Sequence, residues 1–323
     1  MNNIYYVLFF AALVVLELLY FRIARFYKIL DHPNNRSLHE QPTIRGGGII
    51  FYLAAALFYA ITLRPSPLFM VALTIVSLVG FADDVRSLSS FIRLLVQLLA
   101  FVLVLMDIDV SGLSYLMMGL VFIVSVGALN TFNFMDGING LTGGYGLVAM
   151  GSLLYINSFV VHFIESDFVV AIIMSVLVFC YFNFRTNALC FAGDVGSMAL
   201  GFIIIYLIIK LTIVANNYAY GFLLSVYGVD SVLTIIQRLL KKENIFKPHK
   251  LHLFQVTVNY FQIPHLKMSS LYSVVQLSIN ALIIASLTLG NRYQLMIGIA
   301  LVLGLAFIYL FVKLKLIKTA PSN

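Results

Sequence analysis

The sequence predicts an all-α fold, a polytopic bundle of about 11 membrane-spanning helices. Of its 323 residues, 62% are hydrophobic and only 10% are charged, and the mean hydropathy is +1.01. Soluble domains carry about 25% charged residues. The apolar residues also fall in runs close to the roughly 20 residues that cross a hydrocarbon core. We therefore expect residues 1–323 to form a single membrane-embedded domain, without tandem repeats.

The predicted spans follow one another along the whole chain, separated by short polar links. The first, residues 4–20, lacks a preceding basic region and a small-residue cleavage site, so we expect a retained span rather than a removable signal peptide. The shortest is 68–81. The others are 48–63, 91–106, 112–129, 141–157, 168–184, 198–214, 219–239, 271–289 and 294–312.

Basic residues predict the orientation of the bundle. If the segment after the first span faces the cytoplasm, all of the 20 Lys and Arg residues except Arg64, Lys210 and Arg292 fall on that side. This asymmetry obeys the positive-inside rule and places the amino end outside and the carboxyl end in the cytoplasm. The formal charge of +7 then reflects topology and attraction to anionic lipid, and nothing in it calls for nucleic acid.

Polar motifs gather on the predicted cytoplasmic side. A carboxylate near hydrocarbon is expensive and is usually kept for pairing, an ion or a substrate. Four such carboxylates stand at the ends of predicted spans: Asp83 and Asp84 in GFADDVRSL, Asp136 in NTFNFMDGINGLTGG, and Asp194 in FAGDVGSMALG. We expect the cytoplasmic segments to form an active site, namely 22–47, 82–90, 130–140, 185–197 and 240–267.

Each acidic motif also has a structural interpretation. Asp83 and Asp84 could cap a helix end beside Arg86, but adjacent carboxylates repel and a helix C-terminus disfavours anions, so a cation is needed there. Asp194 could be a helix N-cap. Asn133 and Asp136 could form an ordinary polar turn, although amides, an acid and glycines also suit a phosphate or nucleobase site.

The four carboxylates together have a chemical meaning. Their oxygens suit Mg²⁺, which binds through one or two carboxylates plus substrate phosphates. Basic residues and helix N-termini can hold the remaining phosphate charge. The set predicts phosphoryl transfer at a membrane surface, with Mg²⁺ as the cofactor and Mn²⁺ as its alternative.

The loop FKPHKLHLFQ, residues 246–255, places two histidines among lysines. His249 and His252 would share one face of a helix, although Pro248 indicates that no helix has begun there. A zinc site lacks a Cys or Glu partner at the usual spacing, and a solvated surface loop is the plain alternative. Cationic hydrogen-bond donors for phosphate fit the composition better, namely Lys247, His249, Lys250 and His252.

Taken in order, five motifs resemble those of the polyprenyl-phosphate N-acetylhexosamine-1-phosphate transferases, over nearly the whole chain. They are HPNNRSLHEQPTIRGGG, FADDVRSL, NTFNFMDGINGLTGG, FAGDVGSMALG and the HKLHLFQ loop. The resemblance implies that a polyprenyl phosphate attacks the sugar-bearing phosphorus of a UDP-amino sugar and releases UMP. It also implies a bacterial cytoplasmic membrane enzyme with its active site on the cytoplasmic face, and it leaves open a homodimer.

The resemblance also implies roles for the acidic and amide residues. Asp194 matches the principal Mg²⁺ ligand of the family. Asp83 matches the acid proposed to deprotonate or orient the lipid phosphate, with Asp84 beside it. Asn133 and Asp136 match the catalytic-pocket pair.

The substrate-binding residues implied by the resemblance are Arg45, Asn139 and the His249–His252 loop. Asn139 replaces an acid that the family often carries in MDGIDGL. The HKLHLFQ loop is nearer the H-[RK]-x-H-x-[YF]-Q form of transferases that serve O-antigen or capsule synthesis than the triple-histidine form of the lipid I enzyme. This departure argues against a peptidoglycan role.

A transporter with an ion site at its cytoplasmic face is the main alternative. It predicts inverted repeats and polar residues at the membrane midplane. We find no repeat, and the acidic motifs lie on one side. Glu17 and Asp230 are expected to face the bundle interior, but the sequence does not show their partners.

Overall fold

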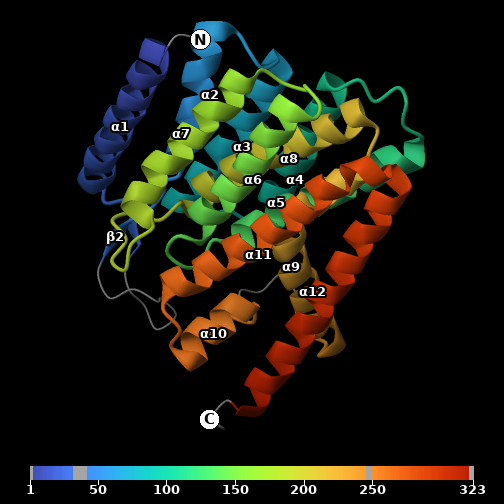
Figure 1. Cartoon of the computed structure of the whole chain (residues 1–323). Coiled ribbons are helices and arrows are strands. Elements are labelled where there is room, and N and C mark those ends of the chain that lie inside the picture. The colour runs from blue at the N-terminus through green and yellow to red at the C-terminus, as the bar shows by residue number, and fades with distance from the viewer. Residues whose placement is uncertain (1–2, 32–41, 245–248, 320–323) are drawn as a thin grey trace.

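The computed structural model describes residues 3–31, 42–244 and 249–319 and confirms the all-α prediction (Figure 1). Its two short strands, β1 (Leu30–Asp31) and β2 (Thr43–Ile44), pair antiparallel. The helices are α1 (Asn3–Phe26), α2 (Ile49–Thr62), α3 (Pro67–Val85), α4 (Ser90–Asp107), α5 (Tyr115–Met135), α6 (Leu141–Phe159), α7 (Ser166–Asn183), α8 (Gly193–Ala215), η1 (Tyr218–Leu224), α9 (Ser225–Leu240), α10 (Leu253–Phe261), α11 (His265–Ala285), η2 (Ser286–Leu289) and α12 (Asn291–Thr319).

Nine helical segments among the described residues are long and apolar enough to cross a membrane. They include α3, which covers the shortest predicted span. Two of the predicted spans, 48–63 and 141–157, correspond to α2 and α6, which are outside this set of nine. The 14 residues of α2 extend only about 21 Å, less than the roughly 30 Å of a hydrocarbon core. In α6, glycines and polar residues interrupt the apolar run.

Helix α8 forms the centre of the bundle, and α1 and α12 lie on opposite sides of it (Figure 1). It packs against α2, α3, α5 and α6. A helix that is buried on every side needs apolar residues all round, which explains its long, mostly apolar sequence. By contrast, only 11% of the most apolar stretch of α12 is buried within the protein.

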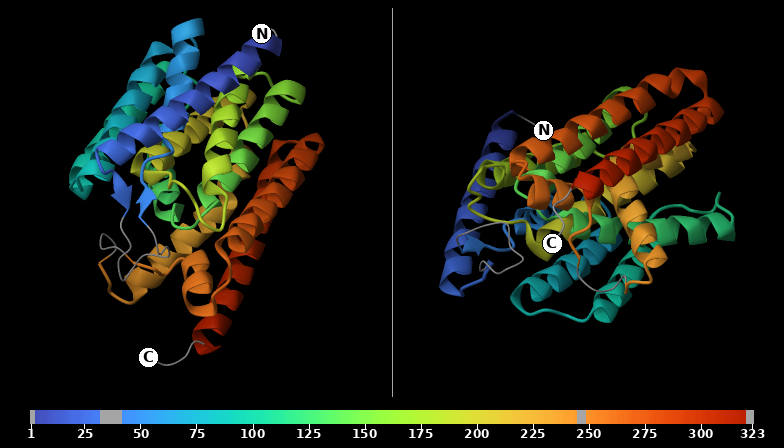
Figure 2. Two further views of the ribbon diagram at one scale, coloured as in Figure 1. Left: turned by 90° about the vertical axis from the view of Figure 1, so that its left-hand side faces the viewer. Right: turned by 90° about the horizontal axis from the view of Figure 1, so that it is seen from below.

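The polar motifs meet at one end of the bundle, the lower end in Figure 1, where α10 and the β1–β2 hairpin lie. In Figure 2 the same end is seen from below. The predicted active-site segments 82–90 and 130–140 are partly helical, because α3 continues through Asp84 and α5 continues through Asn133. Their polar side chains therefore stand on the last turns of rigid helices.

Candidate active site

Asp84 organises the backbone of the site. Its side chain is fully buried on the last turn of α3. One carboxylate oxygen accepts hydrogen bonds from the Asp194 amide at 2.9 Å and from Arg45 Nε at 2.7 Å, and the other accepts one from the Val195 amide at 3.0 Å. A carboxylate is favourable at a helix N-terminus. Asp84 therefore holds the start of α8 and the Arg45 side chain in place.

Asp83 and Asp194 share one guanidinium group. Arg93 Nη1 lies 3.0 Å from Asp83 Oδ2 and 3.2 Å from Asp194 Oδ2, and the two carboxyl groups are within hydrogen-bonding reach of each other. Arg45 Nη2 lies 3.9 Å from Asp194 Oδ1. The cation that adjacent carboxylates require is thus supplied by Arg93 and Arg45.

In the sequence, Arg93 is only one of the basic residues that indicate topology. It stands on the first turn of α4, ten residues after Asp83. One turn further along α4, Gln97 exchanges side-chain hydrogen bonds of 2.7 and 3.3 Å with Asn130 of α5. This amide pair joins α4 to α5 and fixes Arg93 relative to the last turns of α5.

Burial of Arg45 alone would lower the pKa of its guanidinium, but Asp84 and Asp194 together raise that pKa above its usual value. Arg45 is therefore a permanent cation. About a third of its side chain remains accessible, so it can contact a bound anion.

Glycines bring two distant motifs into backbone contact. Gly193 has a φ of +70°, and a Cβ there would lie 2.5 Å from Asp84 Oδ2 and 2.8 Å from the Gly46 backbone. A Cβ on Gly196 would lie 2.5 Å from the Cα of Gly48. The GGG and GDVGS motifs therefore interlock in a way that larger residues would prevent.

Gly193→Ala is expected to lower both the thermal stability and the activity of the protein. The left-handed backbone costs a residue with a Cβ about 1–2 kcal/mol, and the contacts with Asp84 and Gly46 add to this. Gly151→Ala is the matched control, because a Cβ at Gly151 on α6 would have no neighbour within 4 Å. Thermal unfolding of both variants in detergent measures the difference, and equal melting temperatures would contradict the close packing at Gly193.

Asn133 and Asp136 lie at the end of α5, as predicted, and both contact neighbouring helices. Asn133 Nδ2 donates to Ser197 Oγ of α8 at 3.3 Å, and Thr142 Oγ1 of α6 donates to Asp136 Oδ1 at 2.6 Å. Burial is the main reason that the pKa of Asp136 is raised to about 6, and the Thr142 hydrogen bond opposes this rise. Asp136 is therefore mostly ionised at pH 7 and becomes protonated as the pH falls through 6.

Asn139 hydrogen-bonds to the loop that follows α7. Its buried side-chain amide donates to the carbonyl oxygens of Arg185 and Thr186, both at 3.0 Å. Its own carbonyl accepts a hydrogen bond from Ser269 of α11. The contact between Asn139 and a substrate stays a prediction.

The histidine loop is anchored from inside the bundle. Lys247 lies outside the described residues, and Lys250 is partly buried. His252 caps α10 and is 2% exposed, with its Nδ1 3.2 Å from Asp230 Oδ1, and the His249 and His252 ring centroids are 5.0 Å apart. Asp230 thus has the partner that the sequence did not show.

His249 is neutral in this structure. Burial, together with the positive charges near it, lowers its pKa to about 4. Its Nδ1 accepts a hydrogen bond from the Leu251 amide, so its proton is on Nε2. His249 therefore offers one N–H donor rather than the cation expected from composition.

The fold and the site define a polytopic helical membrane protein with a carboxylate–guanidinium cluster at one end. Residues 66–212 match the family model for glycosyl transferase family 4. This match and the relatives of the chain support the polyprenyl-phosphate N-acetylhexosamine-1-phosphate transferase family, which its motifs resemble.

Three relatives illustrate the family. A probable undecaprenyl-phosphate N-acetylglucosaminyl 1-phosphate transferase of Bacillus subtilis is 26% identical over 72% of this chain and 70% of its own length. An undecaprenyl-phosphate alpha-N-acetylglucosaminyl 1-phosphate transferase of Yersinia pestis is 27% identical over 70% and 68%. A phospho-N-acetylmuramoyl-pentapeptide-transferase of Thermotoga maritima is 27% identical over 66% and 76%.

Proposed function

We propose that this protein transfers an N-acetylated amino-sugar 1-phosphate from a UDP-sugar to polyprenyl phosphate, at the cytoplasmic face of a bacterial inner membrane. The observation that carries the proposal is the cluster of Asp83, Asp194 and Arg93, flanked by Arg45, at the end of a membrane bundle. Carboxylates beside guanidinium groups can position phosphate-bearing substrates and accept a proton. The three relatives are all named as transferases, so they lend no support to the transporter alternative.

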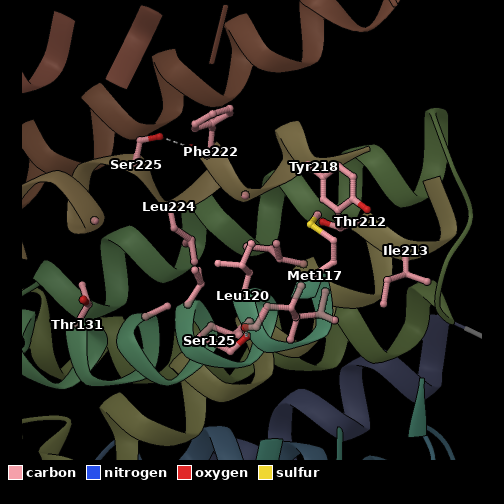
Figure 3. Close-up of a pocket in the computed structure, with 18 of the residues that line it drawn as sticks. Met117, Leu120, Ser125, Thr131, Thr212, Ile213, Tyr218, Phe222, Leu224 and Ser225 are labelled. Carbon is pink, nitrogen blue, oxygen red and sulfur yellow. Dashed lines mark hydrogen bonds between the residues drawn. The ribbon is translucent and has the colours of Figure 1, made fainter. Parts of the chain in front are cut away.

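An apolar groove between the helices suits the acceptor lipid. A cavity of about 920 Å³ lies between α5, α8 and the η1–α9 segment (Figure 3). It extends along α5 from Met117 to Thr131, over about 21 Å at 1.5 Å per residue. Thr131 stands two residues before Asn133, so the groove leads towards the polar end of the bundle. A polyprenyl chain in the groove would have its phosphate at this polar end of the bundle.

The reaction forms one P–O bond and breaks another. An oxygen of polyprenyl phosphate attacks the sugar-bearing phosphorus of the UDP-sugar, and the bond from this phosphorus to the oxygen shared with UMP breaks. Asp83 orients the attacking phosphate or takes its proton. Arg45 and Arg93 offset the negative charge of the phosphates, because guanidinium groups bind them through paired hydrogen bonds.

The carboxylates also fit a divalent cation. No group of three or more His, Cys, Asp or Glu side chains in the described part of the chain is arranged to enclose a metal. Mg²⁺ does not require such a group, because it commonly uses one or two carboxylates and completes its shell with water and substrate phosphate. Asp194 and Asp83 would hold it, and the ion would supply positive charge to the diphosphate.

We propose that the donor is UDP-GlcNAc or another UDP-N-acetylhexosamine, such as UDP-GalNAc, UDP-QuiNAc or UDP-FucNAc, and that the product initiates an O-antigen or a capsule. The HKLHLFQ loop supports this choice over the lipid I reaction. A pocket that hydrogen-bonds a sugar hydroxyl can reject the analogue lacking it by about 10⁴-fold. One sugar should therefore dominate.

Purified protein, undecaprenyl phosphate and a panel of labelled UDP-sugars test the proposal. We expect a labelled lipid product and UMP with one N-acetylhexosamine donor and no product with UDP-MurNAc-pentapeptide. Efficient turnover of the pentapeptide donor would place the chain in the lipid I branch instead. No UMP release from any donor would refute the proposed reaction.

His249→Ala and His252→Ala are each expected to raise the KM for the UDP-sugar about tenfold, because each removes a hydrogen-bonding group near the diphosphate. The KM for polyprenyl phosphate should change little. His162→Ala is the control, because His162 is exposed in the link between α6 and α7. Steady-state kinetics in both substrates measure the effect. If the KM values of both loop variants equal those of the wild type, the loop is a solvated surface loop and does not bind the donor.

A further inference from the structure

Helix α12 buries a hydroxyl and an ammonium group although most of the helix faces outward. Tyr309 is 5% exposed and Lys313 is 4% exposed. They are four residues apart and therefore share one face of the helix. A buried ammonium group within an apolar bundle requires a compensating negative charge. The structure places that charge on Asp230 of α9.

Two hydroxyl groups connect Lys313 to Asp230. Lys313 Nζ lies 2.7 Å from Tyr309 OH and 3.3 Å from Thr234 Oγ1. The same hydroxyl oxygens lie 3.1 and 3.3 Å from Asp230 Oδ1. An ammonium group can only donate hydrogen bonds, so each hydroxyl accepts from Lys313 and is free to donate its own proton to the carboxylate.

Asp230 in turn orients the histidine loop. Its Oδ1 also faces His252 Nδ1 at 3.2 Å and accepts from the Leu253 amide at 3.1 Å, while its Oδ2 accepts from Tyr272 OH at 2.6 Å. A carboxylate that accepts from one ring nitrogen sets both the tautomer and the orientation of an imidazole. His252 Nε2 is buried, and no described residue hydrogen-bonds it.

We propose that Tyr309 and Lys313 are positioning residues for the sugar-nucleotide site, acting through Asp230 on His252. This inference rests on the proposed function. Asp230, oriented by the two hydroxyls and Lys313, accepts from His252 Nδ1–H. This contact fixes the orientation of the His252 ring and leaves its Nε2 as the atom that meets the donor phosphate. The last helix, which lies outside residues 66–212 of the family match, thereby controls the affinity for the donor.

The test compares Tyr309→Phe and Lys313→Met with Lys315→Met, a control on an exposed position of the same helix. Tyr309→Phe keeps the ring and removes only the hydroxyl. We expect both α12 variants to raise the KM for the UDP-sugar about tenfold, the size expected for a lost hydrogen bond to a charged group. The KM for polyprenyl phosphate and the melting temperature of Tyr309→Phe should stay close to those of the wild type.

A double-mutant comparison separates positioning from general damage. If Lys313 acts through His252, then adding Lys313→Met to His252→Ala should raise the KM for the UDP-sugar no further. Three results would overturn the inference and leave the proposed function intact. The first is a double mutant whose KM for the UDP-sugar rises beyond that of His252→Ala. The others are an equal rise of the KM values for both substrates, and α12 variants whose kinetics match those of Lys315→Met. A wild-type protein that releases no UMP from any donor would refute the proposed function and this inference together.

Discussion

Asp194→Asn is expected to lower the rate of sugar-phosphate transfer by about 10²-fold or more, the loss usual for a group that stabilises charge in a transition state. Asparagine keeps the shape of the side chain but removes the carboxyl group that meets Arg93 and Arg45. The Asp194 backbone amide still donates to Asp84, so the start of α8 should stay in place. UMP release under saturating substrates measures the effect.

Asp107→Asn is the control for this experiment. Asp107 ends α4 at the opposite end of that helix from Arg93, and it accepts a hydrogen bond from Tyr206 at 3.1 Å. An asparagine oxygen can accept the same bond, so nearly wild-type activity is expected. Similar losses in the two variants would show that the carboxylate cluster is not the active site.

Removal of divalent cations is expected to abolish UMP release, and Mg²⁺ or Mn²⁺ should restore it. Both substrates bring phosphate charge to a region that already holds Asp83 and Asp194, and a divalent cation offsets this repulsion at close range. Treatment with EDTA followed by readdition of each metal measures the dependence. In Asp194→Asn, the Mg²⁺ concentration that gives half-maximal activity should rise.

Full activity after rigorous chelation would refute the metal requirement and would leave Arg45 and Arg93 as the source of positive charge. Readdition of Mg²⁺ controls for damage by the chelator. The same experiment on Asp107→Asn, with its intact carboxylate cluster, should reproduce the wild-type metal dependence.

Most of the membrane-spanning helices and the gathering of the carboxyl groups at one end of the bundle were predictable, because both follow from the cost of transferring single residues into lipid. A long apolar run has few stable states in a bilayer other than a helix, since the helix satisfies its own backbone hydrogen bonds. Carboxyl groups such as those of Asp83, Asp136 and Asp194 are costly to place in hydrocarbon. They therefore gathered at one end of the bundle, as their placement at the ends of predicted spans indicated.

The division of roles between Asp83 and Asp84 was not predictable from their order. Neighbouring residues on a helix point about 100° apart, so one faces the start of α8 and the other faces Arg93. Which of the two is fully buried depends on where α8 and α4 pack around α3. The contact of Arg93 with Asp83 and Asp194 was not predictable either. A basic residue at this position in the chain could equally well serve only to set the topology.

The sequence alone was sufficient for the fold class, most of the spans and the set of polar motifs, because hydropathy and local pattern depend on each segment separately. Tertiary structure decided which groups pair. Asp230 meets His252 and Tyr309 across 22 and 79 residues, and no local pattern encodes such contacts. They exist because α9, α10 and α12 pack together and bury polar groups that must satisfy one another.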